Sequence, residues 1–412
     1  MTTSRERILA AWRGEPHDHV PLTTWCFGFQ PPQPLRWRRS GQAVDYWYTQ
    51  RLEHIHTLPQ PWELDDDFQR VMAWQSLGVD DVLDVSVPWG IAPEVTWQER
   101  RVEAGEMDPQ YPVMVREYHT PAGALVHAVK LTGEDPGPGW VRQPAAVPLF
   151  EDFNIPRAVK HAVAEAADIA AVRYLYQAPG PAEKTWFQER MRAVKAFSDA
   201  HGIAVQAWAG FGMDALVWMT GAEGAIYLAM DDPQAFASLL EQITEADAAR
   251  VGLAAQTDGV DLITERGWYA STAIWSPKLL DRYLVPHITR MAEIAHVHGK
   301  RFGYVMTTGI KVMGKRLADA GVDVLYFIDP VADQITLEEA RDQLADRMTL
   351  VGGISSLTLS QGAASVERAT RQAMEVLGKS NRFILQPVDS LFPDTPWEAV
   401  QTLIDTWKSY HE

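Results

Sequence analysis

From about residue 180 to the end of the chain, short apolar segments alternate with longer amphipathic ones, and this alternation restricts the fold more than any other feature. Apolar runs bounded by turn residues are typical of buried strands, and a hydrophobic repeat of about 3.6 residues is typical of helices. The predicted strands are 203–210, 259–265, 301–306, 322–328, 348–354 and 382–388. The predicted helices are 182–200, 213–229, 233–256, 277–298, 310–320, 336–346, 365–378 and 396–410. Because the connections are short, consecutive strands should pair in parallel through right-handed crossovers.

The N-terminal part of the chain supplies further strands. An amphipathic run after Ser4 predicts a helix over 5–12, and the apolar segment 20–27 predicts a buried strand. One more strand, at 82–87 or at 171–176, brings the total to about eight, the number in a closed (β/α)8 TIM barrel. An open doubly wound α/β sheet is the alternative. The barrel is favoured because both ends of the chain supply strands and no candidate edge strand is distinctly polar.

Residues 30–150 interrupt the regular pattern. This segment is rich in Pro, Trp and Asp and has few clean periods, apart from a β-hairpin predicted at 113–118 and 124–131 around a Thr-Pro-Ala-Gly turn. The sequence EDPGPG at 134–139 predicts a loop. We therefore expect a single domain over 1–412, in which the irregular insertion covers the mouth of the barrel.

The composition excludes several classes of function. Lys and Arg total 37 against 54 Asp and Glu, so the net charge is −17, and a field of this sign repels nucleic acids and anionic membranes. The one cysteine, Cys26, excludes a disulfide framework and zinc sites built from several thiolates. The charged opening lacks the apolar core of a secretory signal, and no run approaches ~18 uninterrupted apolar residues. These features predict a cytoplasmic protein without a membrane span.

Candidate catalytic groups follow the carboxyl ends of the strands, where the reactive loops of a parallel barrel lie. Glu265 and Asp389 occupy such positions and are candidates for acid–base catalysis or for binding through oxygen, and Tyr304 is the candidate proton donor. The candidate substrate-binding residues are Trp25, Trp208, Arg266, Trp268, Met306, Thr308 and His119. Structural alternatives exist, because Glu265 can form an ion pair with Arg266 and His119 can be an ordinary surface residue.

Tryptophan is frequent in this chain, with 16 residues against 13 Phe and 12 Tyr. An indole ring offers broad apolar contact and one hydrogen-bond donor, so it suits both a core and the wall of a binding site. Most of these residues are expected to pack in the core. Near the predicted mouth, Trp25, Trp89, Trp97, Trp208 and Trp268 would suit a flat or cationic small molecule through stacking or cation–π contact.

Several segments resemble the uroporphyrinogen decarboxylase superfamily, which includes the decarboxylase and the corrinoid-linked methyltransferases. The opening SRERILAAWRGEPHDHVPL is similar to the first helix and strand entry of that group, and WSPKLLDRYLVPHITRMAEIAHVHGKRF is similar to its Ser-Pro helix. LADAGVDVLYFIDP, VGGISSLTLSQGAASVERA and NRFILQPVDSLFPDTPWEAV follow in the family's order. The resemblance covers 1–25 and most of 210–410, and it implies a (β/α)8 barrel with its cleft at the carboxyl ends of the strands.

The chain departs from the functional motifs of that family. The decarboxylases carry an arginine-rich segment after the first strand that binds substrate carboxylates, whereas this chain has TTWCFGFQPPQP there. The methyltransferases hold zinc with a His and two Cys, and the matching positions here are Met306, Thr308 and Asp389. We therefore expect neither uroporphyrinogen as the substrate nor the usual zinc site. A metal site built from carboxylates is left open.

The resemblance and the mouth residues together predict an enzyme that acts on a small organic substrate. Methyl transfer from a methylated donor is the first expectation, with a corrinoid protein as partner and methyl acceptor, because the opening resembles that branch more closely. A carboxy-lyase for a smaller acid, with Arg266 holding the carboxylate, is one alternative. A non-catalytic protein that binds small molecules is the other, and a homodimer is left open.

Overall fold

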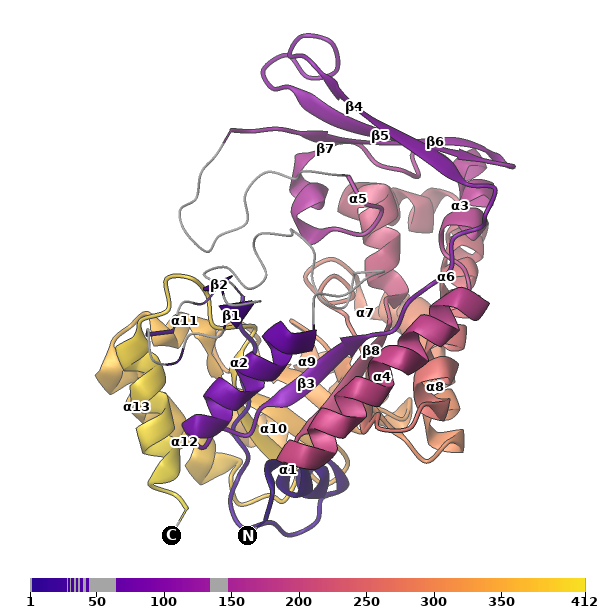
Figure 1. Ribbon diagram of the computed structural model, residues 1–412. Helices are drawn as coiled ribbons and strands as arrows, with labels where there is room; N and C mark the ends of the chain where they lie inside the picture. The colour runs from indigo at the N-terminus through magenta and orange to yellow at the C-terminus, as the bar shows by residue number, and fades with distance from the viewer. Residues whose placement is uncertain are drawn as a thin grey trace.

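The computed structural model describes residues 2–27, 64–133 and 147–411, together with the single residues 29, 31, 32, 35, 38, 39, 42 and 43. Its largest sheet has seven parallel strands in the order β13-β12-β11-β10-β9-β8-β3 (Figure 1). These strands are β3 (Val82–Ser86), β8 (Ala204–Gly210), β9 (Leu262–Glu265), β10 (Arg301–Val305), β11 (Val324–Ile328), β12 (Thr349–Ser355) and β13 (Phe383–Val388). All strands expected from residue 203 onward are confirmed.

Helices connect these strands, as the alternation in the sequence predicts. The longer ones are α4 (Pro181–His201), α5 (Gly212–Asp231), α6 (Pro233–Gln256), α8 (Val285–Val297), α9 (Ile310–Asp319), α10 (Leu337–Leu344), α12 (Ala363–Val376) and α13 (Trp397–Lys408). The others are α1 (Ser4–Arg13), α2 (Leu64–Ser76), α3 (Ile169–Leu175), α7 (Pro277–Leu279), α11 (Ser356–Leu359) and the helical turns η3 (Asp152–Arg157), η4 (Ala166–Asp168) and η5 (Leu280–Leu284). No helix in these described ranges is long and apolar enough to cross a membrane.

The seven-stranded sheet curls, and side chains fill its concave face. The Tyr326 hydroxyl on β11 donates to the Gln206 side chain on β8, although β9 and β10 lie between these two strands in the sheet. Val82, Leu262 and Ile384, from three different strands, belong to one buried cluster on this face. The convex face packs against the helices in a second, larger cluster. Both faces are therefore buried, which explains the nearly continuous apolar runs of the strands.

Helix α1 covers the end of the sheet at which the strands begin. Ile8 and Trp12 are buried in the cluster of the concave face. Thr3 caps the helix with its side chain, and the Thr349 hydroxyl at the start of β12 donates to the Ala11 carbonyl oxygen at 2.7 Å. The carboxyl ends of the strands lie at the opposite end of the sheet, away from α1.

Segment 20–27, expected as a strand, runs beside β13 and makes isolated strand-like pairs. Leu22 pairs in parallel with Leu385, and further along Cys26 pairs with Leu391. On the other side of the segment, the Leu22 carbonyl oxygen accepts a hydrogen bond from the N–H of Asp80, just before β3. Of the two candidates for a further strand, 82–87 forms β3, whereas 171–176 lies largely in α3. The described chain thus has a curled sheet of seven strands where about eight were expected.

A second sheet is antiparallel and has the order β4-β5-β6-β7, and Figure 1 shows it at the end of the molecule opposite the two termini. Its strands are β4 (Thr96–Val102), β5 (Val113–Thr120), β6 (Gly123–Lys130) and β7 (Ala158–Lys160). The expected hairpin is confirmed as β5 and β6. The loop expected at 134–139 lies outside the described residues. A separate short pair consists of β1 (Arg38–Arg39) and β2 (Gln42–Ala43).

Candidate active site

Five aromatic rings gather on the concave face where the strands end. The ring centroid of Trp25 lies 5.4 Å from that of Trp208, 6.0 Å from that of Trp268 and 5.2 Å from that of Tyr326. The Phe327 ring lies 5.6 Å from Trp25 and 5.4 Å from Trp268. Trp25 and Trp268 are partly exposed, and the other three are buried. We call these five residues the aromatic mouth, because the partly exposed indoles offer a surface on which a flat or cationic molecule can stack.

The indoles of Trp208 and Trp268 are each hydrogen-bonded to a carboxyl group. Trp208 Nε1–H donates to Asp84 Oδ1 at 2.9 Å, and the Trp268 side chain is hydrogen-bonded to Asp389. Burial raises the pKa of Asp84 to about 7, and the charge of Arg70 opposes this rise. Burial likewise raises the pKa of Asp389 to about 6, against the hydrogen bond from Trp268. Both carboxyl groups therefore exchange protons near neutral pH, where general acid–base catalysis is effective.

Between the aromatic mouth and α1 the concave face carries four polar side chains, which we call the polar layer. They are Asp84, Gln206, Thr264 and Gln386, each at most 5% exposed. Gln206 Oε1 accepts the hydrogen bond from Tyr326, but Gln206 Nε2, Gln386 Nε2 and Thr264 Oγ1 have no hydrogen-bond partner among the described residues. A buried polar atom without a partner costs about 1–3 kcal/mol. Three such atoms on one face of the sheet, next to the aromatic mouth, suggest a site that receives polar atoms of a ligand.

Alternation along the strands assigns the polar layer to the concave face, because side chains two residues apart point the same way. In β8, Ala204 and Trp208 both belong to the concave cluster, so Gln206 between them faces the same side. The same relation holds in three other strands. Val82, Leu262 and the pair Ile384 and Val388 belong to the concave cluster, so Asp84, Thr264 and Gln386, each two residues away on the same strand, also face the concave side.

The backbone is strained at two positions of the mouth. Phe327 has φ of 74° and Asp389 has φ of 72°, and within the described residues these are the non-glycine residues with positive φ. A non-glycine residue in this conformation costs on the order of 1–3 kcal/mol and is found preferentially at functional sites. The strain lies at the carboxyl ends of β11 and β13, next to the rings and the carboxyl group described above.

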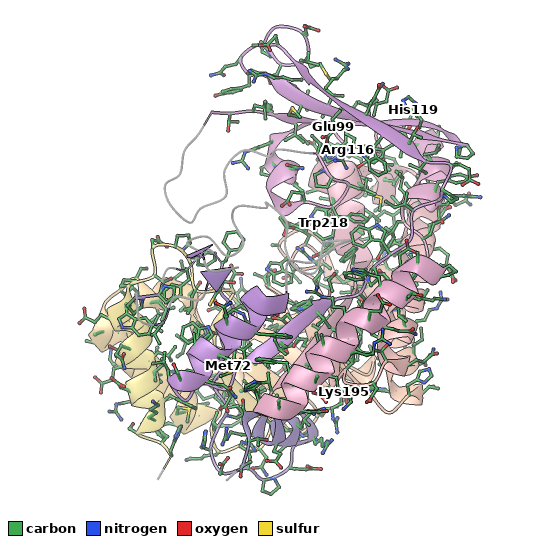
Figure 2. All side chains as sticks on the ribbon, in the orientation of Figure 1. Met72, Glu99, Arg116, His119, Lys195 and Trp218 are labelled. Carbon is green, nitrogen blue, oxygen red and sulfur yellow. The ribbon has the colours of Figure 1, made fainter. Side chains whose placement is uncertain are left out.

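Arg266 is buried and bound by two carboxylates. Its Nε donates to Asp214 Oδ2 of α5 at 2.8 Å, and its Nη2 donates to Asp152 Oδ1 of η3 at 2.9 Å. The Trp218 ring (labelled in Figure 2) and the Trp268 ring have centroids 4.2 and 4.7 Å from its Cζ. Burial opposes the charge of this guanidinium, but Asp152 and Asp214 raise its pKa above the usual value. Arg266 thus fastens η3 to α5 beside the aromatic mouth.

Glu265 lies on the convex side of β9, away from the aromatic mouth. Its two carboxylate oxygens lie 2.9 and 3.0 Å from His287 Nε2 on α8, and His287 Nδ1 lies 2.8 Å from Thr244 Oγ1 on α6. Burial raises the pKa of Glu265. Burial alone would lower the pKa of His287, but the charge of Glu265 raises it. The structure does not bring Glu265 together with Asp389, because the two side chains are on different sides of the sheet.

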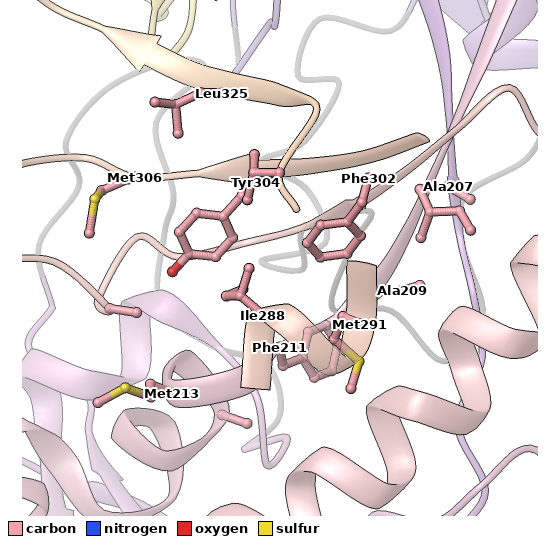
Figure 3. Packing of buried hydrophobic residues seen from close by; sticks show 14 of the residues in the cluster. Ala207, Ala209, Phe211, Met213, Ile288, Met291, Phe302, Tyr304, Met306 and Leu325 are labelled. Atoms are coloured by element: carbon pink, nitrogen blue, oxygen red, sulfur yellow. The ribbon is translucent and has the colours of Figure 1, made fainter. Parts of the chain in front are cut away.

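Tyr304 and Met306 also belong to the packing between the sheet and the helices. In Figure 3 the Tyr304 ring points, like that of Phe302, to the side on which Ile288 of α8 lies. Its hydroxyl is buried and has no hydrogen-bond partner in the described ranges, and burial raises its pKa well above the usual value. Met306 is fully buried in the same cluster. Neither side chain is part of the aromatic mouth.

Thr308 lies in the loop after β10, which is tied to the aromatic mouth. The neighbouring Thr307 hydroxyl donates to the Trp268 carbonyl oxygen at 3.0 Å. Within the described part of the chain the buried Thr308 hydroxyl has no hydrogen-bond partner, while the Thr308 carbonyl oxygen accepts a hydrogen bond from the N–H of Thr272. The loop thus holds an unpaired hydroxyl one residue away from its contact with Trp268.

The other residues expected near the mouth lie elsewhere. His119 is on β5, in the four-stranded sheet, with 47% of its side chain exposed and Glu117 at 3.7 Å (Figure 2). Trp97 is half exposed on β4 of the same sheet. Trp89 is buried and packs against the rings of Phe150 and other aromatic residues of the core. The mouth therefore contains three of the five tryptophans that were expected there.

Asp84 and Gln206, which the structure places beside Trp208, are not among the residues predicted from the sequence. A signal for Asp84 was present, because Asp84 and Ser86 put polar residues at alternate positions of an otherwise apolar strand. A strand buried on both faces has no need of this pattern. The pattern therefore marks one face of β3 as the lining of a polar site.

The former zinc-ligand positions of the resemblance do not converge. Met306 is on the convex side of the sheet, whereas Asp389 is at the aromatic mouth. Across the residues that the structure describes, no group of three or more His, Cys, Asp or Glu side chains is placed to hold a metal ion.

Comparisons with known proteins agree with this architecture. Residues 150–410 match the family model of uroporphyrinogen decarboxylase (URO-D). The chain is similar to the solved structure of a methyltransferase from Methanosarcina mazei over 100% of both chains, with 15% identity and a TM-score of 0.58, which shows a shared fold. The 3-keto-D-glucoside 4-epimerase YcjR from E. coli aligns over 55% of this chain and 86% of its own with 12% identity, but its TM-score of 0.32 is too low to carry an argument. No curated protein matches the sequence.

Proposed function

Because the chain belongs to the uroporphyrinogen decarboxylase family, we propose that it is an enzyme that transfers a methyl group from a small, flat organic donor bound at the aromatic mouth. The full-length similarity in fold to a methyltransferase supports this type of reaction. The observation that carries the proposal is the pairing of two mouth indoles with two carboxyl groups that titrate near neutral pH.

The aromatic mouth supplies the binding surface. The partly exposed rings of Trp25 and Trp268 stack on a flat donor, and the buried Trp208 ring supports both of them from behind. These walls exclude water from the methyl carbon, which is electron-poor when it is bound to a heteroatom. The Thr308 hydroxyl donates a hydrogen bond to the donor. Asp389 exchanges a proton with the donor at the rim of the mouth.

Glu265, Tyr304 and Met306 act in this proposal as positioning residues behind the strands. The Glu265–His287 pair holds β9 against α8, and Trp268 follows Glu265 by only three residues. A loss of this pair would therefore displace a wall of the binding site without removing any contact with substrate. Contact between His119 and the substrate stays a prediction, as does the role of 30–150 as a cover for the mouth.

The methyl acceptor that we propose is a corrinoid carried by a partner protein, which supplies a strong nucleophile for the methyl carbon. Its docking site is the end of the sheet where the strands finish, because α1 covers the other end. We also propose that 20–27 completes a ring of eight members, an arrangement supported by its hydrogen bonds to Leu385 on one side and Asp80 on the other. A cytoplasmic location, which the composition predicts, suits both this enzyme and the corrinoid protein.

Decarboxylation of a small acid is less compatible with the site. The arginine that would hold the substrate carboxylate, Arg266, already binds Asp152 and Asp214. A substrate carboxylate would have to displace one of these partners, and breaking a buried ion pair of this kind costs about 3–5 kcal/mol.

The test is an assay of the purified protein with methoxylated aromatics, methylamines and methyl thioethers, each with chemically reduced cobalamin as acceptor. We expect methylcobalamin, detected by its absorbance, from at least one donor class, with W208A losing about tenfold or more in kcat/KM. Carbon dioxide from a carboxylated substrate, without methylcobalamin, would instead identify a lyase. Tight binding of a donor without any product would identify a binding protein.

A further inference from the structure

We propose that Asp84 is the proton donor to the leaving oxygen of a methyl ether, and that the polar layer selects a neutral, oxygen-bearing aromatic donor. This inference rests on the proposed methyl transfer and deepens it by naming the substrate class. The residue is absent from the set that the sequence analysis assigned to the site.

Asp84 is held in a defined position within the concave face. Its register partner on β8 is Gln206, and the Trp208 indole donates to its Oδ1 at 2.9 Å. Because the buried Trp208 ring packs against the partly exposed Trp25 and Trp268, a ring that stacks on those two indoles lies on the mouth side of Asp84. The carboxyl group thus lies one layer deeper than the rings, on the side of the mouth facing α1.

Among the residues that the structure describes, Asp84 has no ion-pair partner. Arg70 of α2 is a nearby cation, but its guanidinium is hydrogen-bonded to Asp67, Asp81 and the Val82 carbonyl oxygen. Asp67 and Asp81 add negative charge, which favours the protonated form. The groups facing it from β8 and β11 are uncharged, namely Gln206, Trp208 and Tyr326. Burial raises the pKa of Asp84 to about 7, so a large share of the group carries a proton at neutral pH.

The unpaired atoms of the polar layer define the chemistry of the ligand. Gln206 Nε2 and Gln386 Nε2 are N–H donors, so they need acceptor atoms and oppose a cation. A ligand carboxylate would meet the ionised fraction of Asp389 at the rim and that of Asp84 in the layer, and both repel it. An uncharged ring with ether or hydroxyl oxygens satisfies both conditions, because the ring stacks in the aromatic mouth and the oxygens accept hydrogen bonds from the layer.

With a methoxylated aromatic as the donor, the methyl group moves to the acceptor and a proton moves to the ether oxygen. The acceptor, a reduced corrinoid or a thiolate, supplies the electron pair for the new bond to the methyl carbon. The bond between that carbon and the ether oxygen breaks, and its electron pair stays on the oxygen. The Asp84 proton moves to this oxygen, so a neutral phenol leaves and Asp84 becomes a carboxylate that takes up a proton from water before the next turnover. The acid is needed because a phenolate is a poor leaving group in an apolar site.

The test compares Asp84→Asn with the wild type on a series of ring-substituted methoxybenzenes, with reduced cobalamin as acceptor. Without its acid the variant should lose about 100-fold or more in turnover on donors that release weakly acidic phenols. It should lose far less on nitro-substituted donors, whose phenolates leave without a proton. The plot of log kcat against phenol acidity is therefore expected to be steeper for the variant. Asp258→Asn, a change in a side chain that is 87% exposed, is the matched control and should follow the wild type.

Parallel plots for the wild type and Asp84→Asn would overturn the inference, because a structural role of Asp84 affects all donors equally. Turnover of methylamines but of no methoxybenzene would also overturn it, while leaving methyl transfer intact. No methylcobalamin from any donor would be a failure of the proposed function itself. If the variant does not fold, the wild-type profile decides: kcat on the weakly acidic series should fall above about pH 7, and kcat on the nitro-substituted series should not.

Discussion

Asp84 and Asp389 have the same side chain and the same kind of partner, a tryptophan indole, but they differ in depth. Asp84 is 5% exposed within the concave face, whereas Asp389 is at the rim on a strained backbone. Burial raises the pKa of Asp84 to about 7 and that of Asp389 to about 6. Between these values Asp84 retains its proton more than Asp389 does, as the role of Asp84 as the acid requires.

At the residue scale, the pH profile should have one limb, which Asp84 sets. Turnover of methyl ethers with reduced cobalamin is expected to fall above about pH 7, as Asp84 loses its proton. Asp389→Asn should keep this decline, because neither the ether nor the reduced cobalamin carries a proton that Asp389 could accept. Kinetics of methylcobalamin formation between about pH 5 and 9 measure this, and loss of the decline in Asp389→Asn would assign it to Asp389 instead of Asp84.

At the element scale, the sequence predicts the helices and most strands but cannot orient the strands. In β9, Leu262 and Thr264 face the concave side, and Ile263 and Glu265 face the helices. Both faces of a parallel strand are buried, so apolar residues occupy both and no alternation in hydrophobicity distinguishes them. This is why Glu265 could be assigned to a strand end from the sequence but not to a side. Trp25, Trp208 and Trp268 were assigned to the mouth because each lies near the carboxyl end of an expected strand. Asp84 lies in the middle of β3 and was not assigned.

Two glycines of α5 differ in the space that surrounds them. Gly212 has φ of 48°, and a Cβ there would lie 2.5 Å from Glu265 Oε1 and 3.0 Å from His287 Nε2. Gly212→Ala should therefore lower the free energy of unfolding by about 2 kcal/mol or more, through backbone strain and a displaced ion pair. Gly224→Ala is the matched control in the same helix, because its nearest atom would be 3.7 Å away, and it should raise stability by ~0.5–1 kcal/mol. Urea denaturation compares the two, and equal effects would contradict the packing described for Gly212.

At the scale of the whole molecule, the buried Glu265–His287 pair should make stability depend on pH. Both groups have raised pKa values, so the folded state binds more protons than the unfolded state, and the free energy of unfolding should fall as pH rises from about 5 upward. Glu265→Gln should lower this free energy by about 3 kcal/mol, by leaving His287 without its charged partner, and should flatten the pH dependence. Urea denaturation at several pH values measures both effects, and turnover of the folded variant reports on the displaced Trp268 wall.

The control for this prediction is Glu245→Gln. Glu245 forms an exposed ion pair with Arg290, which should contribute no more than ~1 kcal/mol. A pH dependence in Glu265→Gln that equals the wild type's would show that other buried groups, and not this pair, set the response of the fold.

Helix α1 has a kinetic consequence for the proposed reaction. Because it seals the far end of the concave face with Ile8 and Trp12, a small molecule that reaches Asp84 has to enter past the same rings that a bulky methyl acceptor would cover. The methyl donor and the methyl acceptor would then use the same entrance, so the donor has to bind before the acceptor docks. Steady-state kinetics should accordingly follow a compulsory order, with the demethylated product trapped until the acceptor departs.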